Sequence, residues 1–245
     1  FQQKGPFSFQ NDEINCFAED RWGRIWMGGK EKGLHVYDPS SQRFYNFRYD
    51  PSREGTIADN RIHCIYRDGD GRIWLGTSRG LCIYQPGRQQ FSQQFLQPAA
   101  NTNLTIYAFY EDEDKSIWMG TSQGIFIRRP DGRLQHRTLS FKGVPLQVTS
   151  FYKEDAGTFY LGTDYSVFRY NPITGQIALL PNTEKDGVMN RIITSRVVCM
   201  AKDTINGRPV LLTLPYGHYL TYYDFKNQRW VSRLDRLNII ERFNL

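Results

Sequence analysis

The sequence lacks several features that are typical of nucleic-acid-binding, membrane-spanning or newly secreted proteins. It has no run of five or more Lys or Arg residues, and its longest basic pair is Arg128-Arg129, although the net charge is +6. Nucleic-acid-binding domains normally carry a clustered basic surface, so we expect no nucleic-acid partner. No apolar run approaches the roughly 20 residues of a membrane helix, and the first residues do not form a signal peptide. We therefore expect membrane attachment only through segments absent from this sequence.

Catalytic and metal-binding motifs are also missing. There is no G-x-S-x-G, H-E-x-x-H or Walker loop, and the four histidines are scattered. The stretch DGDGR at 68–72 begins like a calcium loop, but Arg72 and Ile73 stand where such a loop needs Asp or Asn and Gly. The four cysteines are expected to be buried free thiols. The sequence predicts no enzyme activity, no metal and no cofactor.

The sequence does contain an internal repeat. A glycine closes or nearly closes each of the phrases GRIWMG, GRIWLG, SIWMG and FYLGT, at Gly28, Gly76, Gly120 and Gly162. The steps between these glycines are 48, 44 and 42 residues. This period fits a unit of four short strands and is too long for a leucine-rich repeat.

Each repeat divides into four expected strands. The first strands are expected at 14–20, 62–68, 106–112, 148–155 and 197–203. The second strand carries Trp-x-Gly, and a Pro closes the third strand in the first four copies. In the fifth copy RPVLLTL at 208–214 replaces the Trp-x-Gly strand. An atypical last copy is common in repeat proteins.

One column of the repeat favours a particular architecture. Cys16, Cys64, Ala108, Ser150 and Cys199 occupy the same place in the first strands, and all are small. We expect these strands to be innermost, crowded and buried on both faces, as in sheets that stack on sheets. The predicted fold class is therefore all-β, a β-propeller of about five four-stranded blades, truncated or part of a larger ring. The blades are expected at 12–50, 60–97, 104–140, 146–182 and 193–235 of a single domain, 1–245.

The stretches DRWGRIWMGG, DGDGRIWLGT and DEDKSIWMGT resemble the two-component regulator propeller repeat. The weaker copy YKEDAGTFYLGT continues it. The resemblance implies the periplasmic sensor portion of a hybrid two-component sensor histidine kinase of Bacteroidetes, which senses glycan fragments. It implies a chain that is itself not an enzyme and belongs to the periplasmic part of an inner-membrane sensor.

The two ends of the sequence bear on ring closure. GPFSF at 5–9 has the place of a fourth strand, and NIIERFNL at 238–245 has the place of another first strand. An N-terminal strand that completes the last sheet would close a small ring. Open sheet edges would instead favour a homo-oligomer.

Ligand contacts are expected where the repeats diverge, before the first strand and in the loop between the second and third strands. Arg, Asn, Asp and aromatic rings there suit an oligosaccharide, and the cations suit an acidic one. The candidate ligand-binding residues are Lys30, Arg61, Arg79, Asn103, Tyr107, Gln123, Asp164, Tyr165, Arg196, Tyr216 and His218.

Two other functions stay open at this point. A propeller enzyme, such as a polysaccharide lyase or glycosidase, would need a converging Tyr, His and Arg, or two carboxyls. A pure protein-interaction scaffold would need neither. The leading prediction is a non-catalytic sensor module that binds a glycan-derived ligand or mediates association of the sensor.

Overall fold

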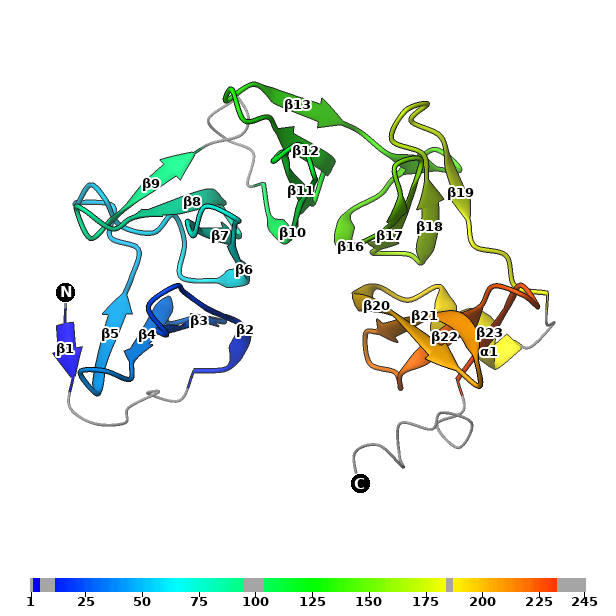
Figure 1. The fold of residues 1–245 in the computed structure, drawn as a ribbon, viewed down its shortest axis with the longest axis horizontal. Coiled ribbons are helices and arrows are strands. Elements are labelled where there is room, and N and C mark those ends of the chain that lie inside the picture. Colours follow the sequence, from blue (N-terminus) through cyan, green and yellow to red (C-terminus); the bar gives the residue numbers. More distant parts are fainter. Residues whose placement is uncertain (1, 5–11, 95–103, 184–186, 233–245) are drawn as a thin grey trace. The chain divides into compact units, whose positions relative to one another are not determined.

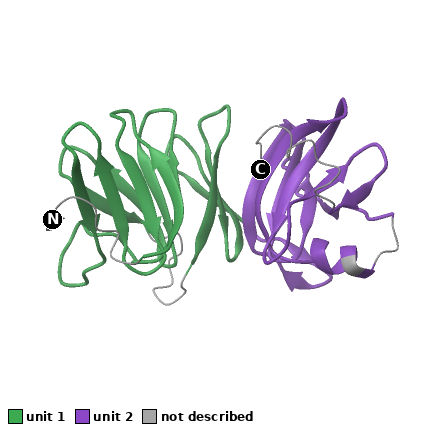
Figure 2. Cartoon of the chain, turned by 90° about the horizontal axis from the view of Figure 1, so that it is seen from below, with its two compact units in different colours: residues 1–137 green, residues 138–245 purple. Residues whose placement is uncertain are grey.

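A computed structural model describes residues 2–4, 12–94, 104–183 and 187–232. The chain divides into two compact units, unit 1 (Phe1–Arg137) and unit 2 (Thr138–Leu245), which Figure 2 colours separately. In the described ranges α1 (Gly187–Ile193) is the only helix. No helix in these ranges has the length and apolar character needed to cross a bilayer.

Four consecutive antiparallel strands form each of five sheets in the described part of the chain (Figure 1). The first strands are β2 (Ile14–Glu19), β6 (Ile62–Arg67), β10 (Ile106–Glu111), β16 (Val148–Asp155) and β20 (Val197–Ile205). The second strands are β3 (Ile25–Gly29), β7 (Ile73–Thr77), β11 (Ile117–Thr121), β17 (Thr158–Thr163) and β21 (Arg208–Pro215). The third strands are β4 (Leu34–Asp38), β8 (Gly80–Gln85), β12 (Gly124–Arg128), β18 (Val167–Tyr170) and β22 (Thr221–Asp224). The fourth strands are β5 (Arg43–Phe47), β9 (Gln90–Gln94), β13 (Leu134–Arg137), β19 (Ile177–Leu179) and β23 (Arg229–Val231). The predicted all-β fold of four-stranded propeller blades is confirmed, and the eroded fifth copy forms a sheet like the others.

Three elements differ from the sequence prediction. Strand β1 (Gln2–Lys4) pairs with β5 and adds a fifth strand to the first sheet, whereas the last sheet is formed by β20–β23. Segments 5–9 and 238–245, on which the predictions about ring closure rest, lie outside the described residues. A hairpin of β14 (Ser140–Phe141) and β15 (Val144–Pro145), and helix α1, were not predicted. Lys142 and Gly143, both with positive φ, form the tight hairpin turn.

A buried aspartate organises the turn between the first and second strands of blade 1. Asp20 Oδ1 accepts from the backbone N–H groups of Trp22 and Arg24, at 2.9 and 3.0 Å. Its Oδ2 accepts from Arg24 Nε at 2.6 Å and from Trp26 Nε1 at 2.9 Å. Burial opposes ionisation of Asp20, but these hydrogen bonds outweigh it and lower its pKa. The spacing D-x-x-G-R-I-W is thus the spacing of one carboxylate and its donors.

Burial of the first strands agrees with the prediction only in part, because β6, β10 and β16 are mostly buried or half-buried, whereas β2 and β20 are mostly exposed. In β2 only Cys16 and Ala18 are half-buried, and the other four residues are exposed. The second strands are the buried ones, and every residue of β7 is buried. In the strand order each first strand is an edge of its sheet, whereas the second and third strands have a bonded neighbour on both sides. The core therefore lies over the middle strands.

The small column of the first strands has a specific partner. Cys16, Cys64 and Ser150 pair with Gly28, Gly76 and Gly162, each directly after a one-residue bulge. A side chain added at any of these glycines would collide with the small residue opposite it and with the first strand of the next blade.

Burial of the cysteines was predicted only in part. Cys82 is buried, Cys16 and Cys64 are half-buried, and all four cysteines are free. Cys199 is exposed, so the prediction of a buried thiol is wrong there. Its partner is Leu214 rather than Gly, because the fifth sheet has lost the Trp-x-Gly strand.

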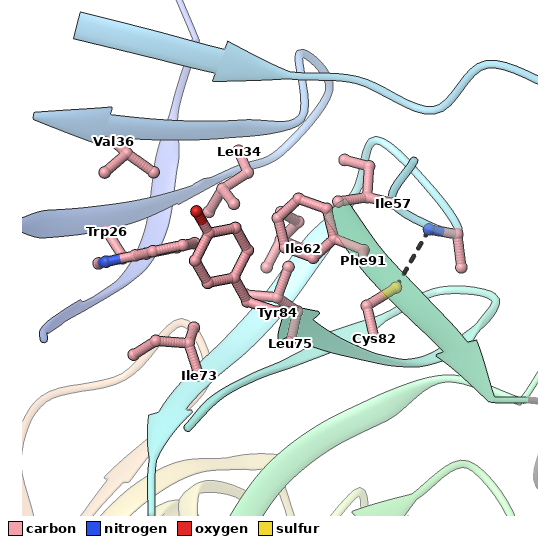
Figure 3. Close-up of a cluster of buried hydrophobic side chains, with 11 residues drawn as sticks. Trp26, Leu34, Val36, Ile57, Ile62, Ile73, Leu75, Cys82, Tyr84 and Phe91 are labelled. Atoms are coloured by element: carbon pink, nitrogen blue, oxygen red, sulfur yellow. Dashed lines mark hydrogen bonds between the residues drawn. The ribbon is translucent and has the colours of Figure 1, made fainter. Parts of the chain in front are cut away.

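The core between blades 1 and 2 is shown in Figure 3. Trp26 of β3 meets the Tyr84 ring of β8 edge-on, with ring centroids 4.8 Å apart. Ile62 of β6 lies between the two blades and is fully buried. The backbone N–H of Ala58 donates to Cys82 Sγ at 3.1 Å, and burial raises the pKa of this thiol to about 12. Cys82 is thus a packed, uncharged core residue.

Candidate functional site

One backbone hydrogen bond recurs in all five blades and joins the two regions where ligand contacts are expected. The residue after the second strand donates its N–H to the carbonyl of a residue just before the first strand. The pairs are Lys30 with Glu13, Ser78 with Arg61, Ser122 with Thr105, Asp164 with Gln147, and Tyr216 with Arg196, at 2.7–3.3 Å. Residues that are distant in sequence therefore lie side by side at one end of each blade.

A threonine fixes the loop that follows the second strand in three blades. In blade 2, Thr77 Oγ1 donates to the Gly80 carbonyl at 2.9 Å and accepts from the Arg79 N–H at 3.1 Å. Thr121 and Thr163 make the same bonds around Gln123 and Tyr165. These bonds involve only the threonine and backbone groups, so the side chains in the middle of the turn can differ between blades.

Blade 1 fixes its longer loop with a buried aspartate. Asp12 Oδ1 accepts from the Glu31 N–H at 3.1 Å, and Oδ2 accepts from the Lys32 N–H at 3.0 Å. His35 Nε2 lies 3.3 Å from the same Oδ2. Burial lowers the pKa of His35 despite the nearby Asp12 carboxylate. Asp12 accepts hydrogen bonds from the loop backbone, and His35 contacts the same carboxylate. We therefore assign this His–Asp pair a structural role.

Three predicted cations converge at the loop end of unit 1. Lys30 Nζ forms an ion pair with Glu13 Oε2 at 2.7 Å. Arg61 Nε donates to the Lys30 carbonyl at 3.2 Å, which joins blade 2 to blade 1. Arg79 Nε lies 4.0 Å from Asp59 Oδ2. Within the described residues Arg61 is exposed and its guanidinium forms no ion pair, while its backbone N–H donates to Asp59 Oδ1 at 2.7 Å.

An aromatic pair continues this row into blade 3. The rings of His63 and Tyr107 meet edge-on with centroids 5.4 Å apart. His63 Nε2 lies 2.9 Å from Ser78 Oγ. We call Lys30, Arg61, His63, Arg79 and Tyr107 the cationic loop surface.

Sequence reasoning missed His63. The residue occupies the bulge of β6, between Ile62 and Cys64, where the repeats also diverge. The same bulge position holds Tyr107 in β10, which was predicted. The residue between the first apolar position and the small position of each first strand differs from blade to blade, and this difference is the signal that could have identified His63.

Gln123 also belongs to unit 1 and lies in the turn between β11 and β12. Its N–H donates to Thr121 Oγ1 and its carbonyl lies 2.8 Å from His136 Nε2. Asn103 lies outside the described residues.

Five predicted residues belong to unit 2, namely Asp164, Tyr165, Arg196, Tyr216 and His218. Asp164 Oδ1 accepts from the Gln147 N–H at 2.9 Å, so this carboxylate fixes its own loop. Tyr165 is 38% exposed, and its ring centroid lies 5.8 Å from that of Phe141 on the hairpin. Tyr216 is 72% exposed beside Arg196. His218, the fifth predicted residue of this unit, is exposed.

A polar pocket of about 430 Å³ opens elsewhere on unit 1. Arg48, Arg53, Glu54 and Arg88 line it, together with the turn before β9. The sequence analysis did not single out these residues. No group of three or more His, Cys, Asp or Glu side chains that could hold a metal occurs in the part of the chain that the structure describes.

Comparison with known families identifies the repeats. The family model of the two component regulator propeller matches residues 8–31, 56–79 and 101–123. These three segments contain the Trp-x-Gly strands β3, β7 and β11 of blades 1–3, so the predicted repeat family is confirmed. A search among curated proteins found no match.

Solved structures share the fold. The extracellular domain of the hybrid two-component system BT3049 from B. thetaiotaomicron has a TM-score of 0.70 and 19% identity, over 93% of this chain and 31% of that chain. The extracellular domain of BT4673 from the same organism has a TM-score of 0.68 and 22% identity, over 86% of this chain and 27% of that one. Virginiamycin B lyase from Staphylococcus aureus has a TM-score of 0.62 and 12% identity, over 92% of this chain and 71% of that chain. The chain therefore spans about a third or less of the two sensor proteins.

Proposed function

We propose that this chain is a non-catalytic sensor module from the periplasmic part of a hybrid two-component system, and that it binds an acidic, glycan-derived oligosaccharide. The repeat family and the fold shared with the extracellular domains of BT3049 and BT4673 support the sensor role. The ligand class rests on one observation: the guanidinium of the exposed Arg61 forms no ion pair in the described chain, and it lies beside Lys30.

The chemistry of the cationic loop surface fits such a ligand. An Arg guanidinium can bind a carboxylate or sulfate through two parallel hydrogen bonds, and these charge-assisted bonds are stronger than neutral ones. The exposed, adjacent Arg79 adds a second guanidinium, and Tyr107 and His63 offer ring edges and polar atoms. The ligand then replaces the water around these side chains. Their loops are already held in place by the backbone hydrogen bonds at the end of each blade.

A thermal-shift screen tests this proposal. The probes are a sulfated disaccharide, oligogalacturonate and a neutral cello-oligosaccharide, because a ligand that binds only the folded state raises its stability. At 100 times Kd the gain is about 2.7 kcal/mol, which raises Tm by roughly 5–10 °C in a domain of this size. We expect a shift with an acidic probe only.

Variants locate the binding surface. The double variant Arg61→Ala, Arg79→Ala should lose the shift. The matched double variant Arg53→Ala, Arg88→Ala removes two exposed arginines from the polar pocket and should keep it. No shift with any acidic probe, or equal shifts in both variants, would contradict this location.

One observation favours testing the enzyme alternative as well. His63 and Tyr107 lie together, and a polysaccharide lyase would require a His and a Tyr to converge with an Arg. The lyase of Staphylococcus aureus supports only the shared fold. Release of unsaturated products from oligogalacturonate, abolished by His63→Ala, would favour an enzyme over a sensor module.

A further inference from the structure

The polar pocket of unit 1 is lined by charged side chains that the sensor proposal does not use. Its lining comes from the end of β5, from the loop that follows β5, and from the turn between β8 and β9. Its volume of about 430 Å³ falls in the range of small-molecule sites. The charged residues of the lining are Arg48, Asp50, Arg53, Glu54 and Arg88.

The loop wall of this pocket is fastened to blade 2. The Phe91 N–H of β9 donates to the Gly55 carbonyl at 2.8 Å, and Gln93 Nε2 donates to the Thr56 carbonyl at 2.9 Å. Gly55 has a φ of 76°, and an added Cβ would lie 2.8 Å from Gln90 Cδ, so this position favours glycine. The wall is therefore formed before a ligand arrives, which lowers the entropic cost of binding.

Two of the five charged side chains are engaged by their own neighbours. Arg48 Nε donates to Asn46 Oδ1 at 3.0 Å. Asp50 Oδ1 accepts from the Ser52 N–H at 2.9 Å and from Ser52 Oγ at 2.6 Å. These hydrogen bonds, and to a smaller extent the charge of Arg53, lower the pKa of the Asp50 carboxyl. Arg48 and Asp50 thus belong to the walls, and their formal charges cancel.

The other three charged side chains remain open to a ligand. Arg53, Glu54 and Arg88 are all exposed, and no ion pair joins any of them to another residue in the described ranges. Because Glu54 pairs with neither arginine, the pocket presents two positive groups and one negative group at separate positions on its lining.

We propose that the polar pocket binds a free α-amino acid with an acidic side chain. Such a molecule carries two carboxylates and one ammonium group at neutral pH. The Arg53 and Arg88 guanidiniums bind the carboxylates through charge-assisted hydrogen bonds, and the Glu54 carboxylate binds the ammonium. This site is independent of oligosaccharide binding, because the cationic loop surface consists of other residues.

Other ligand classes match the three charges less well. An acidic sugar has no cationic group, so it would face Glu54 with nothing to compensate that carboxylate. An amino acid such as alanine has one carboxylate and would leave one guanidinium without a partner. The acidic amino acid is the smallest class that pairs every open charge of the pocket.

Isothermal titration of the full chain with L-glutamate, glutarate and L-alanine tests this match. Glutarate is L-glutamate without the ammonium group, and L-alanine lacks the second carboxylate. We expect L-glutamate to bind about tenfold more tightly than either compound, since each of them loses one charge-assisted contact.

Three variants assign the contacts, and all the substituted residues are exposed, so the fold should persist. The double variant Arg53→Ala, Arg88→Ala should lose binding of both L-glutamate and glutarate. Glu54→Gln should bind these two compounds within about twofold of each other, because its neutral amide no longer favours the ammonium. The matched double variant Arg61→Ala, Arg79→Ala of the cationic loop surface should bind L-glutamate as tightly as the unmodified chain.

Several outcomes would overturn the proposal. L-glutamate that changes neither the heat of mixing nor Tm is one of them, and equal affinities for the three compounds are another. Binding of L-glutamate that survives Arg53→Ala, Arg88→Ala would overturn it too, as would a preference over glutarate that survives Glu54→Gln. The oligosaccharide screen depends on Arg61 and Arg79 instead, so failure of the sensor proposal is distinguishable from failure of this one.

Discussion

The indole Nε1 of Trp74 donates a hydrogen bond of 2.8 Å to Oδ2 of Asp68, six residues earlier. The same oxygen accepts from Arg72 Nε at 2.6 Å, and Oδ1 accepts from the backbone N–H groups of Asp70 and Arg72. Trp74 is fully buried, so the bond joins the blade core to the turn that connects β6 and β7. This one carboxylate explains why Asp, Arg and Trp occur together in the first two copies of the repeat.

Loss of the Asp68 carboxylate should destabilise the chain. Asp68→Ala leaves the buried Trp74 N–H and two backbone donors without their acceptor, so we expect a loss of about 2–4 kcal/mol in unfolding free energy. Urea denaturation measures this loss. The control is Asp70→Ala, because its exposed pair with Arg72 is worth less than about 1 kcal/mol. Equal effects of the two variants would contradict the role of Asp68.

The equivalent Asp20 should make stability depend on acid pH. Its pKa in the folded chain is lowered by its hydrogen bonds, so the unfolded chain binds the proton more tightly. The stabilisation is therefore complete above the unfolded pKa of about 4, and is lost as pH falls through the folded value. Asp20→Asn should flatten this part of the curve of Tm against pH. An unchanged slope of Tm against pH in this variant would contradict the role of Asp20.

The sequence predicted the blades well because the residues that build a blade are close along the chain. Asp68, Gly71 and Trp74 fall within seven residues, so their spacing reports their contacts directly. The exposure of Phe17, at 78%, depends instead on contacts between blades, and no spacing inside the blade records that. The bond from Arg61 to the Lys30 carbonyl likewise joins two blades, so both residues were candidates from the sequence without any sign that they meet.

Gly76 should tolerate no side chain. A Cβ there would collide with Cys64 Sγ and with the backbone and side chain of Ile106 in the next blade. We expect Gly76→Ala to cost about 1–3 kcal/mol, as overpacking of a core does. Gly87, which has nothing within 4 Å of an added Cβ, is the matched control, and Gly87→Ala should be near neutral. Equal melting temperatures for the two variants would contradict the close blade contact.

The exposed Cys199 should be the thiol that reacts in the folded chain. Cys82 is buried, and burial raises the pKa of Cys16 to about 12, so these thiols are shielded or uncharged. Titration with a chromogenic disulfide under native conditions should modify one thiol rapidly, and all four in denaturant. Cys199→Ser should abolish the rapid phase. A rapid phase that persists in this variant would contradict the burial pattern.

Lys115 departs from the repeat, since it stands where blades 1 and 2 have Gly23 and Gly71, and it has a φ of 64°. A side chain in this left-handed region costs energy that Gly avoids. Lys115→Ala and Lys115→Gly both remove the ion pair with Glu111, so their difference isolates the backbone term. We expect the Gly variant to melt about 2–4 °C above the Ala variant. Equal melting temperatures would mean that the turn relaxes without cost, and that the glycines of the first two blades serve another purpose.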